Sequence, residues 1–493
     1  MTLPSPRRSA GPGSLGPRAA PAEALRLSVM SQLENAYRRS PIAIQHAMAT
    51  AFGLKERALR HRGRFREYVD QLERDQWQTP EYLAQMQAAR LRAMVAFCVE
   101  QVPHYTSLFE ELGLTAADIG GPADLKLLPI LDKEVVRADP EAFRPLNLRE
   151  RIVSQTTGGT TGTPLRYWVT ASAVQYNYAA YEARFRHWAG VALGDRMASI
   201  NGRKIVPIEQ TKPPFWRHNL AFNQLYLSAY HLTEENLPRY VDQLEKYRPN
   251  VIVGYASSVH LIADFINRNG LEGRVRPTAV LVSSETLFPW MRADIERAFS
   301  CKVHDGYGLG ELAAFITECA SGGYHISPEY GVVEAVEIDG EKRLIATGLF
   351  NRAMPLLRYD TGDVVELADP SKRCPCGRDL PLVDKLLGRA DDHVVTPEGR
   401  SVGPAPLSLA FQSVAGISEA QIRQDDPSAV TVSLVVLPDF GAADQELLDQ
   451  ELRERLGPNL AIDYEQVESI PRTTWGKRRL VDSRVGRRER TEG

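Results

Sequence analysis

The sequence predicts an α/β fold, with a large N-terminal region that begins with helices and a small α+β unit at the C-terminus. Three observations predict it: apolar residues at helical spacing before residue 145, apolar runs alternating with helical stretches from 150 to 385, and separate strands and helices after 388. A chain of 493 residues exceeds what one hydrophobic core usually serves. We therefore expect domains at 22–387 and 388–483, between disordered tails at 1–21 and 484–493.

The first expected element is the helical region from residue 22 to about 145. Apolar residues recur there at spacings of three and four, which places them on one helix face. They are Leu83, Met86, Leu91, Met94, Val95 and Cys98. Because Cys98 shares this face, we expect it in the core.

The middle region, from 150 to 385, reads as strands alternating with helices. The run 251–253 before Gly254 predicts a buried strand, followed by a helix over 258–268. The run 279–282 predicts a second strand, followed by a helix from Pro289 to Phe299. This alternation is typical of parallel strands, whose ligands bind in loops at the carboxyl ends.

The last region, beyond a boundary near residue 388, is expected to be a small α+β unit. Residues 393–402 can form a hairpin around Glu398-Gly399, since glycine tolerates the backbone angles of a tight turn. A strand is expected over 430–437 and a helix over 445–456, which Gly457-Pro458 would end.

Composition and charge exclude several classes of partner. Hydrophobic residues make up 43% of the chain and charged residues 25%, with a formal net charge of −3. This balance gives no electrostatic reason to expect nucleic acid as a partner, and no apolar run reaches the ~18 residues of a membrane span. The N-terminal tail lacks the apolar core of a secretory signal, and five cysteines are too few for a disulfide framework. We expect a cytoplasmic protein.

The first motif is a Gly/Thr-rich loop after the extended run 152–154. Glycines let a backbone approach phosphate closely, and small side chains leave N–H and hydroxyl groups to donate to it. The alternative is a surface loop without a ligand, because such loops use the same residues. The candidate phosphate-binding residues are Thr156, Thr157, Gly158, Gly159, Thr160, Thr161 and Gly162.

The second motif is Tyr307-Gly308-Leu309-Gly310-Glu311, placed just beyond a strand expected to end at His304. A carboxylate beside a triphosphate can hold Mg²⁺, so Glu311 is the candidate ligand. The alternative is a glutamate in the first turn of an exposed helix, where it suits the helix dipole.

The third motif is Arg358-Tyr359-Asp360-Thr361-Gly362-Asp363. The carboxylate of Asp363 could accept hydrogen bonds from two ribose hydroxyls, as acidic residues do in dinucleotide folds. The alternative is a hairpin turn, since Asp-Thr-Gly-Asp is good turn chemistry without any ligand.

Two further motifs are weak when taken alone. The run 388–392 contains Arg389 and Asp391 and could be a solvated linker, and the run 471–477 ends in Gly476-Lys477 and could be a plain loop.

Taken in order, the five motifs resemble those of the adenylate-forming enzymes, which include acyl- and aryl-CoA synthetases. The resemblance covers residues 90 to 480 and is greatest to the branch of phenylacetate–CoA ligases and their CapK-like relatives. The stretches that point to this branch are 102–105, 127–133, 374–378 and 395–400.

The resemblance implies a large adenylation domain, a mobile small domain and a role for each motif. The first loop would hold the ATP phosphates, Glu311 the Mg²⁺ and Asp363 the ribose. Arg389 would meet the nucleotide, Asp391 would be the hinge, and Lys477 would bridge the acid and the α-phosphate as a catalytic residue. The nucleotide would also contact Tyr307, Gly308, Ser284, Glu285 and Thr286, and the acid would contact Tyr255, Ser258 and Gly306.

Two departures from the family pattern stand out. Thr163 lies where many members have lysine, and Gly310 lies where threonine or serine usually precedes the glutamate. The second departure removes a hydroxyl contact to phosphate, and it keeps a degenerate, non-catalytic relative as an alternative.

A zinc site is a separate hypothesis. Cys319, His325, Cys374 and Cys376 form a Cys₃His set suited to tetrahedral Zn²⁺, with Cys301 and His304 as spare candidates. Such a site would be structural and would connect two loops of the nucleotide site. The alternative is ordinary thiols, with His325 facing the acid pocket.

The leading functional interpretation is ATP-dependent activation of an aryl or small acyl carboxylic acid as its adenylate, followed by transfer to CoA. The first alternative is an amide or ester ligase that passes the acyl group to an amine or hydroxyl in polysaccharide or natural-product synthesis. The second is a zinc-binding interaction protein. Expected partners are the acid and CoA, and the helical N-terminal region could support a homodimer.

Overall fold

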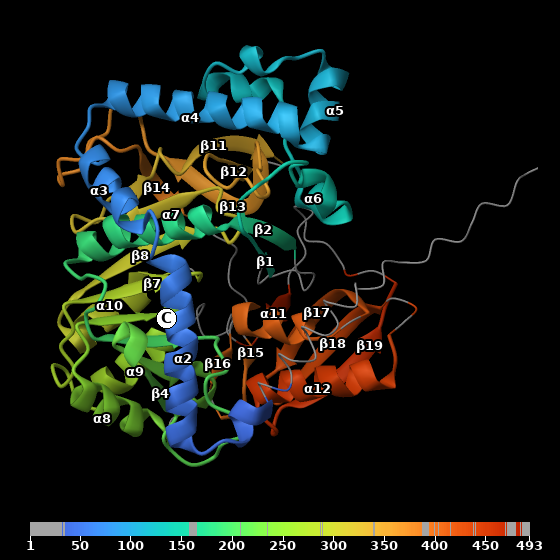
Figure 1. The fold of residues 1–493 in the computed structure, drawn as a ribbon. Helices are drawn as coiled ribbons and strands as arrows, with labels where there is room; N and C mark the ends of the chain where they lie inside the picture. The colour runs from blue at the N-terminus through green and yellow to red at the C-terminus, as the bar shows by residue number, and fades with distance from the viewer. Residues whose placement is uncertain are drawn as a thin grey trace, which may run out of the picture.

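In the computed structural model, one large region lies beside a small C-terminal domain (Figure 1). The described residues are 32, 35–156, 165–386, 394–470, 480–483 and 485, apart from 208, 234, 286, 288, 339, 340, 399, 403, 415, 437, 439 and 469.

The large region is built on one mixed sheet of twelve strands, in the order β11-β12-β13-β14-β10-β9-β8-β7-β6-β3-β5-β4. Five neighbouring strands run parallel, which confirms the predicted α/β fold. These are β3 (Met197–Asn201), β5 (Gln224–Ser228), β6 (Val251–Gly254), β7 (Ala279–Ser283) and β8 (Lys302–Gly308). The antiparallel members are β4 (Trp216–Asn219), β9 (Phe315–Glu318), β10 (Tyr324–Ile326), β11 (Gly331–Ile338), β12 (Glu341–Gly348), β13 (Tyr359–Leu367) and β14 (Leu382–Leu386).

A separate hairpin and two sets of helices surround this sheet. Strands β1 (Ile152–Thr156) and β2 (Arg166–Thr170) pair antiparallel on either side of the predicted phosphate loop. The helical N-terminal region contains α2 (Ile42–Arg60), α3 (Phe65–Asp75), α4 (Pro80–Gln101), α5 (Pro103–Leu112) and α6 (Lys133–Ala138). The later helices are α7 (Ala171–Tyr181), α8 (Leu237–Tyr247), α9 (Ala256–Arg268) and α10 (Pro289–Phe299).

Helix α4 illustrates how the sequence sets an element. Its N-cap Thr79 accepts a hydrogen bond from the Tyr82 amide, Pro80 suits the first turn, and the chain leaves the helix at Val102. The apolar positions predicted to share one face are buried, except for the half-buried Met86, and Cys98 is fully buried as expected.

Side chains alternate between the two faces of the parallel strands, and each face packs into a separate hydrophobic core. Ala198, Ile200, Leu225 and Leu227 face the core under α8, α9 and α10, where they pack with residues such as Ile252. The other core lies under α3, α4, α5 and α7.

The small domain has its own hydrophobic core. Its strands are β15 (Val394–Val395), β16 (Ser401–Val402), β17 (Ile417–Asp426), β18 (Ala429–Val436), β19 (Ala461–Gln466) and β20 (Val481–Ser483), and its helices are α11 (Pro404–Gln412) and α12 (Ala442–Leu456). The predicted hairpin at 393–402 is confirmed by the pairing of β15 with β16, and α12 covers the predicted helix at 445–456.

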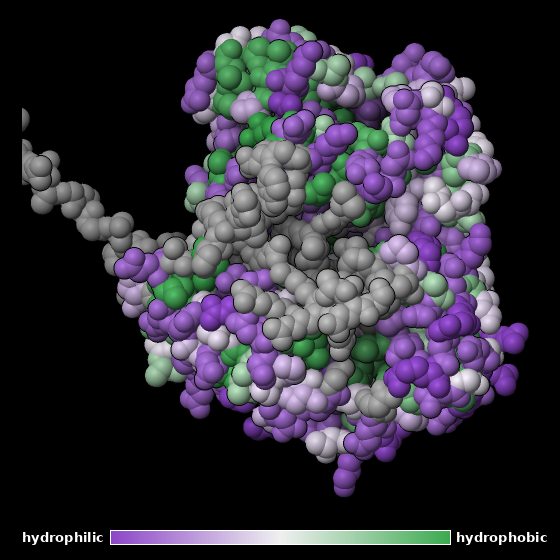
Figure 2. Space-filling view, turned by 180° about the vertical axis from the view of Figure 1, so that it is seen from behind, coloured by the Kyte–Doolittle hydropathy of each residue, from purple (hydrophilic) through white to green (hydrophobic). Residues whose placement is uncertain are grey.

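The surface of the molecule is mostly hydrophilic on the face that Figure 2 shows, with hydrophobic residues in small groups. Within the described part of the chain, no helix combines the length and apolar character that a bilayer span needs.

Candidate active site

The carboxyl ends of the parallel strands meet at one edge of the sheet, as the sequence predicts. Ser284 follows β7 in the left-handed region, at φ 72°, and Tyr307 and Gly308 end β8. The expectation that the strand before Tyr307 ends at His304 is wrong. Strand β8 continues to Gly308, because β9 pairs with its last three residues and satisfies their backbone groups.

Tyr307 and Asp363 connect two of the predicted nucleotide motifs. The Tyr307 hydroxyl donates to Asp363 Oδ2 at 2.8 Å. Asp-Thr-Gly-Asp is not a hairpin turn here: it lies inside β13, where the register with β12 shifts and Gly362 takes φ 77°. With this bulge in β13, the Asp363 carboxylate points toward Tyr307, at the same edge of the sheet as Ser284.

Glu311 is buried in a turn rather than exposed on a helix, and the helix interpretation of this motif is therefore wrong. Its Oε1 accepts a hydrogen bond from the Tyr359 hydroxyl at 3.1 Å and lies 3.5 Å from Lys133 Nζ. Only 6% of the Glu311 side chain is exposed. A buried carboxylate can hold Mg²⁺ beside a polyphosphate, and the neighbouring ammonium adds positive charge there.

The glycine before Glu311 has a steric reason. A Cβ atom at Gly310 would lie 2.8 Å from the Tyr167 hydroxyl oxygen, so a threonine or serine there would require this tyrosine to shift. The Tyr167 hydroxyl donates to Gln155 Oε1 at 2.7 Å, one residue before Thr156. Tyr167 thus brings a hydroxyl to the place where the family pattern has a side-chain hydroxyl.

Several predicted site residues lie outside the described residues. They are Thr157, Gly158, Gly159, Thr160, Thr161, Gly162, Thr286, Arg389, Asp391 and Lys477. Thr156 is described at the end of β1, and Glu285 is buried next to Ser284.

Two cavities open on this edge of the sheet. The first, of about 840 Å³, lies between the large region and the small domain, and Tyr255 lines it together with Lys204. The second, of about 420 Å³, extends into the large region, and Gly306, Tyr307 and Gly308 line it. The two cavities share Tyr178, Asn201, Arg203, Val253, Ser283 and Ser284. Ser258 lines a third, smaller cavity with Glu285 and Arg400.

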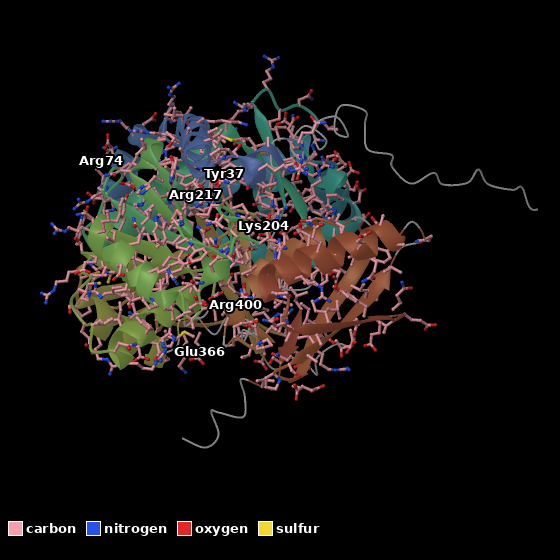
Figure 3. All side chains as sticks on the ribbon, turned by 90° about the horizontal axis from the view of Figure 1, so that it is seen from below. Tyr37, Arg74, Lys204, Arg217, Glu366 and Arg400 are labelled. Carbon is pink, nitrogen blue, oxygen red and sulfur yellow. The ribbon has the colours of Figure 1, made fainter. Side chains whose placement is uncertain are left out.

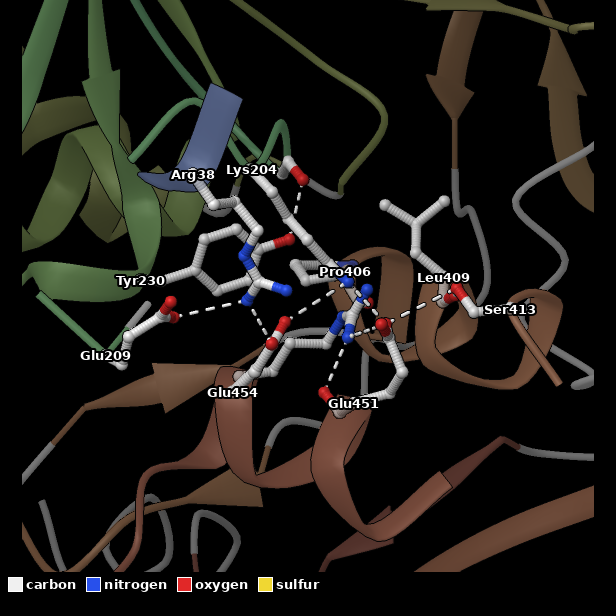
Figure 4. Close-up of polar contacts among 11 residues, drawn as sticks. Arg38, Lys204, Glu209, Tyr230, Pro406, Leu409, Ser413, Glu451 and Glu454 are labelled. Carbon is white, nitrogen blue, oxygen red and sulfur yellow. Dashed lines mark hydrogen bonds and ion pairs between the residues drawn. The ribbon is translucent and has the colours of Figure 1, made fainter. Parts of the chain in front are cut away.

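Ionic contacts hold the small domain in its present orientation (Figures 3 and 4). Lys204 of the large region pairs with Glu451 and, at 3.4 Å, with Glu454 of α12. Arg38 also pairs with Glu454. Arg400 donates from the small domain to the Tyr230 carbonyl at 2.7 Å. Lys204 lines the first cavity together with Leu409, Ser413 and Arg455 of the small domain, so the orientation of the small domain sets the shape of this cavity.

The predicted zinc ligands come together. The four ligand atoms of Cys319, His325, Cys374 and Cys376 all lie within 4.8 Å of one another. Cys319 Sγ is 3.6 Å from Cys374 Sγ, and Cys376 Sγ is 3.3 Å from His325 Nε2. Tetrahedral zinc with Zn–S bonds of ~2.3 Å needs sulfur atoms ~3.7 Å apart, so the spacing suits this ion.

The surroundings of the four ligands are consistent with a closed site. His325 Nδ1 faces the Leu380 carbonyl at 3.4 Å, which leaves Nε2 directed at the thiols. A Cβ atom at Gly323 would lie 2.6 Å from Cys374 Sγ, so glycine leaves room for the cluster. His325 is fully buried and lines neither of the two large cavities, and the spare candidates Cys301 and His304 lie outside the group.

Some residues of the site were not predicted from the sequence. Lys133 and Tyr359 contact Glu311, although both fall in stretches that the sequence had already marked, 127–133 and 358–363. Tyr167, which lies next to Gly310, has no motif around it. The same is true of Arg60 and His61, which line the second cavity.

The sequence of the chain is similar to those of known proteins. Residues 394–484 match the family model of the CapK C-terminal domain. The chain is 32% identical over 458 residues to the protein CapK of Staphylococcus aureus. This alignment covers 91% of this chain and 99% of that protein. It is 27% identical over 447 residues to phenylacetate–coenzyme A ligase of Thermus thermophilus, covering 82% of this chain and 97% of that enzyme.

A solved structure shares the fold. 2-Hydroxyisobutyryl-CoA ligase, in complex with its adenylate and CoA in the thioesterification state, has a TM-score of 0.53 to this structure at 18% identity. The match covers 85% of this chain and 94% of that one.

Proposed function

Because the chain belongs to the CapK and phenylacetate–CoA ligase branch of the adenylate-forming enzymes, we propose that it activates a carboxylic acid with ATP and transfers the acyl group to CoA. The observation that carries the proposal is the convergence of Ser284, the Tyr307–Asp363 pair and the buried Glu311 at one sheet edge, where two cavities meet. One cavity would hold the acid, and the other lies under the small domain.

The proposed chemistry makes a poor electrophile reactive. A carboxylate oxygen of the acid attacks the α-phosphorus of ATP, the bond to the bridging oxygen breaks, and pyrophosphate leaves. The thiolate sulfur of CoA then attacks the acyl carbon, and AMP leaves. The first step brings two anions together, so the site must supply positive charge in a place shielded from water.

We assign this charge to residues of the chain as follows. Lys477 bridges the acid and the α-phosphate, and Lys133 adds a cation beside Glu311. The donor set fits Mg²⁺, which binds through one carboxylate, here Glu311, together with phosphate oxygens. When bound, Mg²⁺ neutralises phosphate charge. The Tyr307–Asp363 pair orients the ribose, and the loop from Thr156 holds the phosphates.

The experiment that tests the function measures pyrophosphate release from ATP with a panel of acids, with and without CoA. Acid-dependent release that yields a CoA thioester supports the proposal. Acid-dependent adenylate that CoA does not consume contradicts the CoA transfer. A folded protein with no acid-dependent release contradicts acid activation altogether.

A second acceptor class is the competing proposal, and the 32% identity to CapK favours considering it. In that case the adenylate passes to an amine or a hydroxyl of a polysaccharide or natural-product precursor. Adding sugar amines and alcohols to the assay separates the two proposals, because the acceptor that consumes the trapped adenylate is the substrate.

We further propose that Asp391 is the hinge about which the small domain swings between the two steps. The ion pairs of the present orientation are largely buried in the interface: the side chain of Lys204 is 20% exposed and that of Glu451 is 12% exposed. Removing two charges from water costs free energy that offsets much of their attraction, so such pairs contribute little net stability and can break during each cycle. A swing would carry Lys477 away and open the acyl carbon to CoA.

Replacing the hinge residue should separate the two half-reactions. We expect Asp391→Pro to leave acid-dependent ATP–pyrophosphate exchange within a few-fold of wild type and to abolish thioester formation, because proline fixes the backbone angle φ. Rapid-quench assays of each half-reaction measure this, with Asp391→Ala, which leaves the backbone free to rotate, as the matched control. Equal loss of both half-reactions in Asp391→Pro contradicts the hinge.

We also propose that Cys319, His325, Cys374 and Cys376 bind a structural Zn²⁺. The cluster joins the end of β9 and strand β10 to the loop between β13 and β14. Strand β9 pairs with Tyr307 on β8, and β13 carries Asp363. The ion would therefore steady both residues of the ribose-orienting pair without entering the reaction.

A further inference from the structure

Where the sheet forms it, the wall of the second cavity combines apolar side chains such as Met197, Val253 and Phe315 with polar ones. Every second side chain of β3 points toward the cavity, namely Met197, Ser199 and Asn201. On β5 the same pattern brings Gln224 and Tyr226 to the cavity wall. The Gln224 amide donates to the Ser199 hydroxyl, and both residues are buried. The opposite face of the same two strands is entirely apolar. A pocket for a hydrocarbon or plain aryl group would not need buried amides and hydroxyls, which cost free energy unless they are paired.

Three arginines line the same cavity, and no aspartate or glutamate of the described chain does. Arg60 ends α2, Arg186 ends the helical turn after α7, and Arg203 follows β3. Each guanidinium stacks on a tyrosine ring: Arg60 on Tyr178 at 4.4 Å, Arg186 on Tyr181 at 5.1 Å and Arg203 on Tyr226 at 5.7 Å.

The carboxylates that anchor two of these arginines lie outside the cavity wall. Arg60 pairs with Glu56 one turn earlier on α2, and Arg186 pairs with Glu182 at 2.9 Å. One carboxylate occupies at most two of the five N–H donors of a guanidinium, so each arginine keeps donors for a ligand.

The surroundings of His61 disfavour a charged imidazole ring in this cavity. Burial, followed by the nearby Arg186 and Arg60, lowers the pKa of His61 to about 4, and Glu182 offsets this only in part. The imidazole is therefore neutral at pH 7. Its Nδ1 is buried and has no hydrogen-bond partner among the described residues. A neutral ring that lines the same cavity as Arg60 and Arg186 can hydrogen-bond to a ligand without adding charge.

We propose that the acid carries a second anionic group, as in a compact dicarboxylic acid, and that Arg60, Arg186 and His61 bind that group. The carboxylate to be activated would lie at the other end of the cavity, near Gly308. This inference rests on the proposed function and deepens it: of the two expected classes, it selects a small acyl acid and not an aryl acid. A cavity of about 420 Å³ holds such a molecule.

The test compares acids that differ only by the second charge. ATP–pyrophosphate exchange is measured with dicarboxylic acids of increasing length and with the monoamide of each, which has the same size. We expect kcat/KM to be about 10²-fold higher for the best diacid than for its monoamide, because losing one partner of a desolvated charge pair has an effect of about this size.

Matched variants then locate the effect. Arg60→Gln should reduce the preference for the diacid by at least ~10-fold, as expected for a lost charge-assisted contact. Lys55→Gln removes a positive charge from an exposed position on the same helix that does not line the cavity. It should leave the preference unchanged. If Arg60→Gln does not fold, Arg186→Gln replaces it, because Arg186 is the other arginine proposed to bind the anionic group.

Two outcomes would overturn the inference and remain distinct from a failure of the proposed function. In the first outcome, phenylacetate or a monoamide supports exchange as well as the diacid does. The protein would then still activate acids, but the inference of a second anionic group would be wrong. If no acid supports exchange, the proposed function fails, and calorimetric binding of the same acid pairs decides the inference. A protein that binds the diacids no better than their monoamides overturns it.

Discussion

Lys477→Ala is expected to lower acid-dependent ATP–pyrophosphate exchange by at least ~10²-fold, the usual effect of removing a preorganised charge that stabilises a transition state. The acid and the α-phosphate are both anionic, and Lys477 is the residue proposed to bridge them as the new bond forms. Lys133 cannot replace it, because its ammonium lies beside Glu311.

The same variant should keep the second half-reaction. If the small domain withdraws Lys477 before CoA attacks, Lys477→Ala should convert a synthetic acyl-adenylate and CoA to thioester at close to the wild-type rate. Arg478→Ala removes the neighbouring charge and serves as the control. Near wild-type exchange by a folded Lys477→Ala protein would remove this lysine from the mechanism.

Cys374→Ser is expected to abolish zinc binding and to lower the free energy of unfolding by ~3 kcal/mol or more, since a structural zinc ion contributes directly to folding. The reason is geometric: three thiols and an imidazole are held within one coordination sphere, and serine is a poor ligand for this ion. Metal analysis of chelator-washed protein and denaturant unfolding measure the two effects.

Cys301→Ser is the matched control for the zinc prediction. Cys301 is half-buried and lies outside the cluster, so its replacement should leave one equivalent of zinc in place. Wild-type protein that holds no zinc after growth in zinc-supplemented medium would contradict the site, as would equal metal content in Cys374→Ser and Cys301→Ser.

The elements with local signals could be predicted from the sequence. The strand at 251–254, the helix Pro289–Phe299 and the hairpin at 394–402 each depend on periodicity or turn chemistry within a few residues. The zinc ligands could be proposed because cysteine and histidine restrict the chemistry to few options, although 55 residues separate Cys319 from Cys374.

What could not be predicted depends on contacts between distant segments. Strand β8 continues past His304 because β9 folds back on it, and no local pattern announces that pairing. Tyr167 explains the glycine at 310, but the two residues meet only in the folded chain. Arg60 and His61 lie at the end of a helix more than a hundred residues before the strands that line the same cavity, so neither residue could be assigned to an acid pocket from the sequence.

The central claim is that this protein activates an acid by joining it to AMP, and mass spectrometry of the trapped product tests it most directly. Protein is incubated with ATP, Mg²⁺ and the diacid panel in the absence of CoA. We expect an acyl-adenylate and one equivalent of pyrophosphate, both dependent on the acid. Acid-dependent release of ADP and phosphate, or ATP cleavage that is the same with and without acid, would contradict the claim.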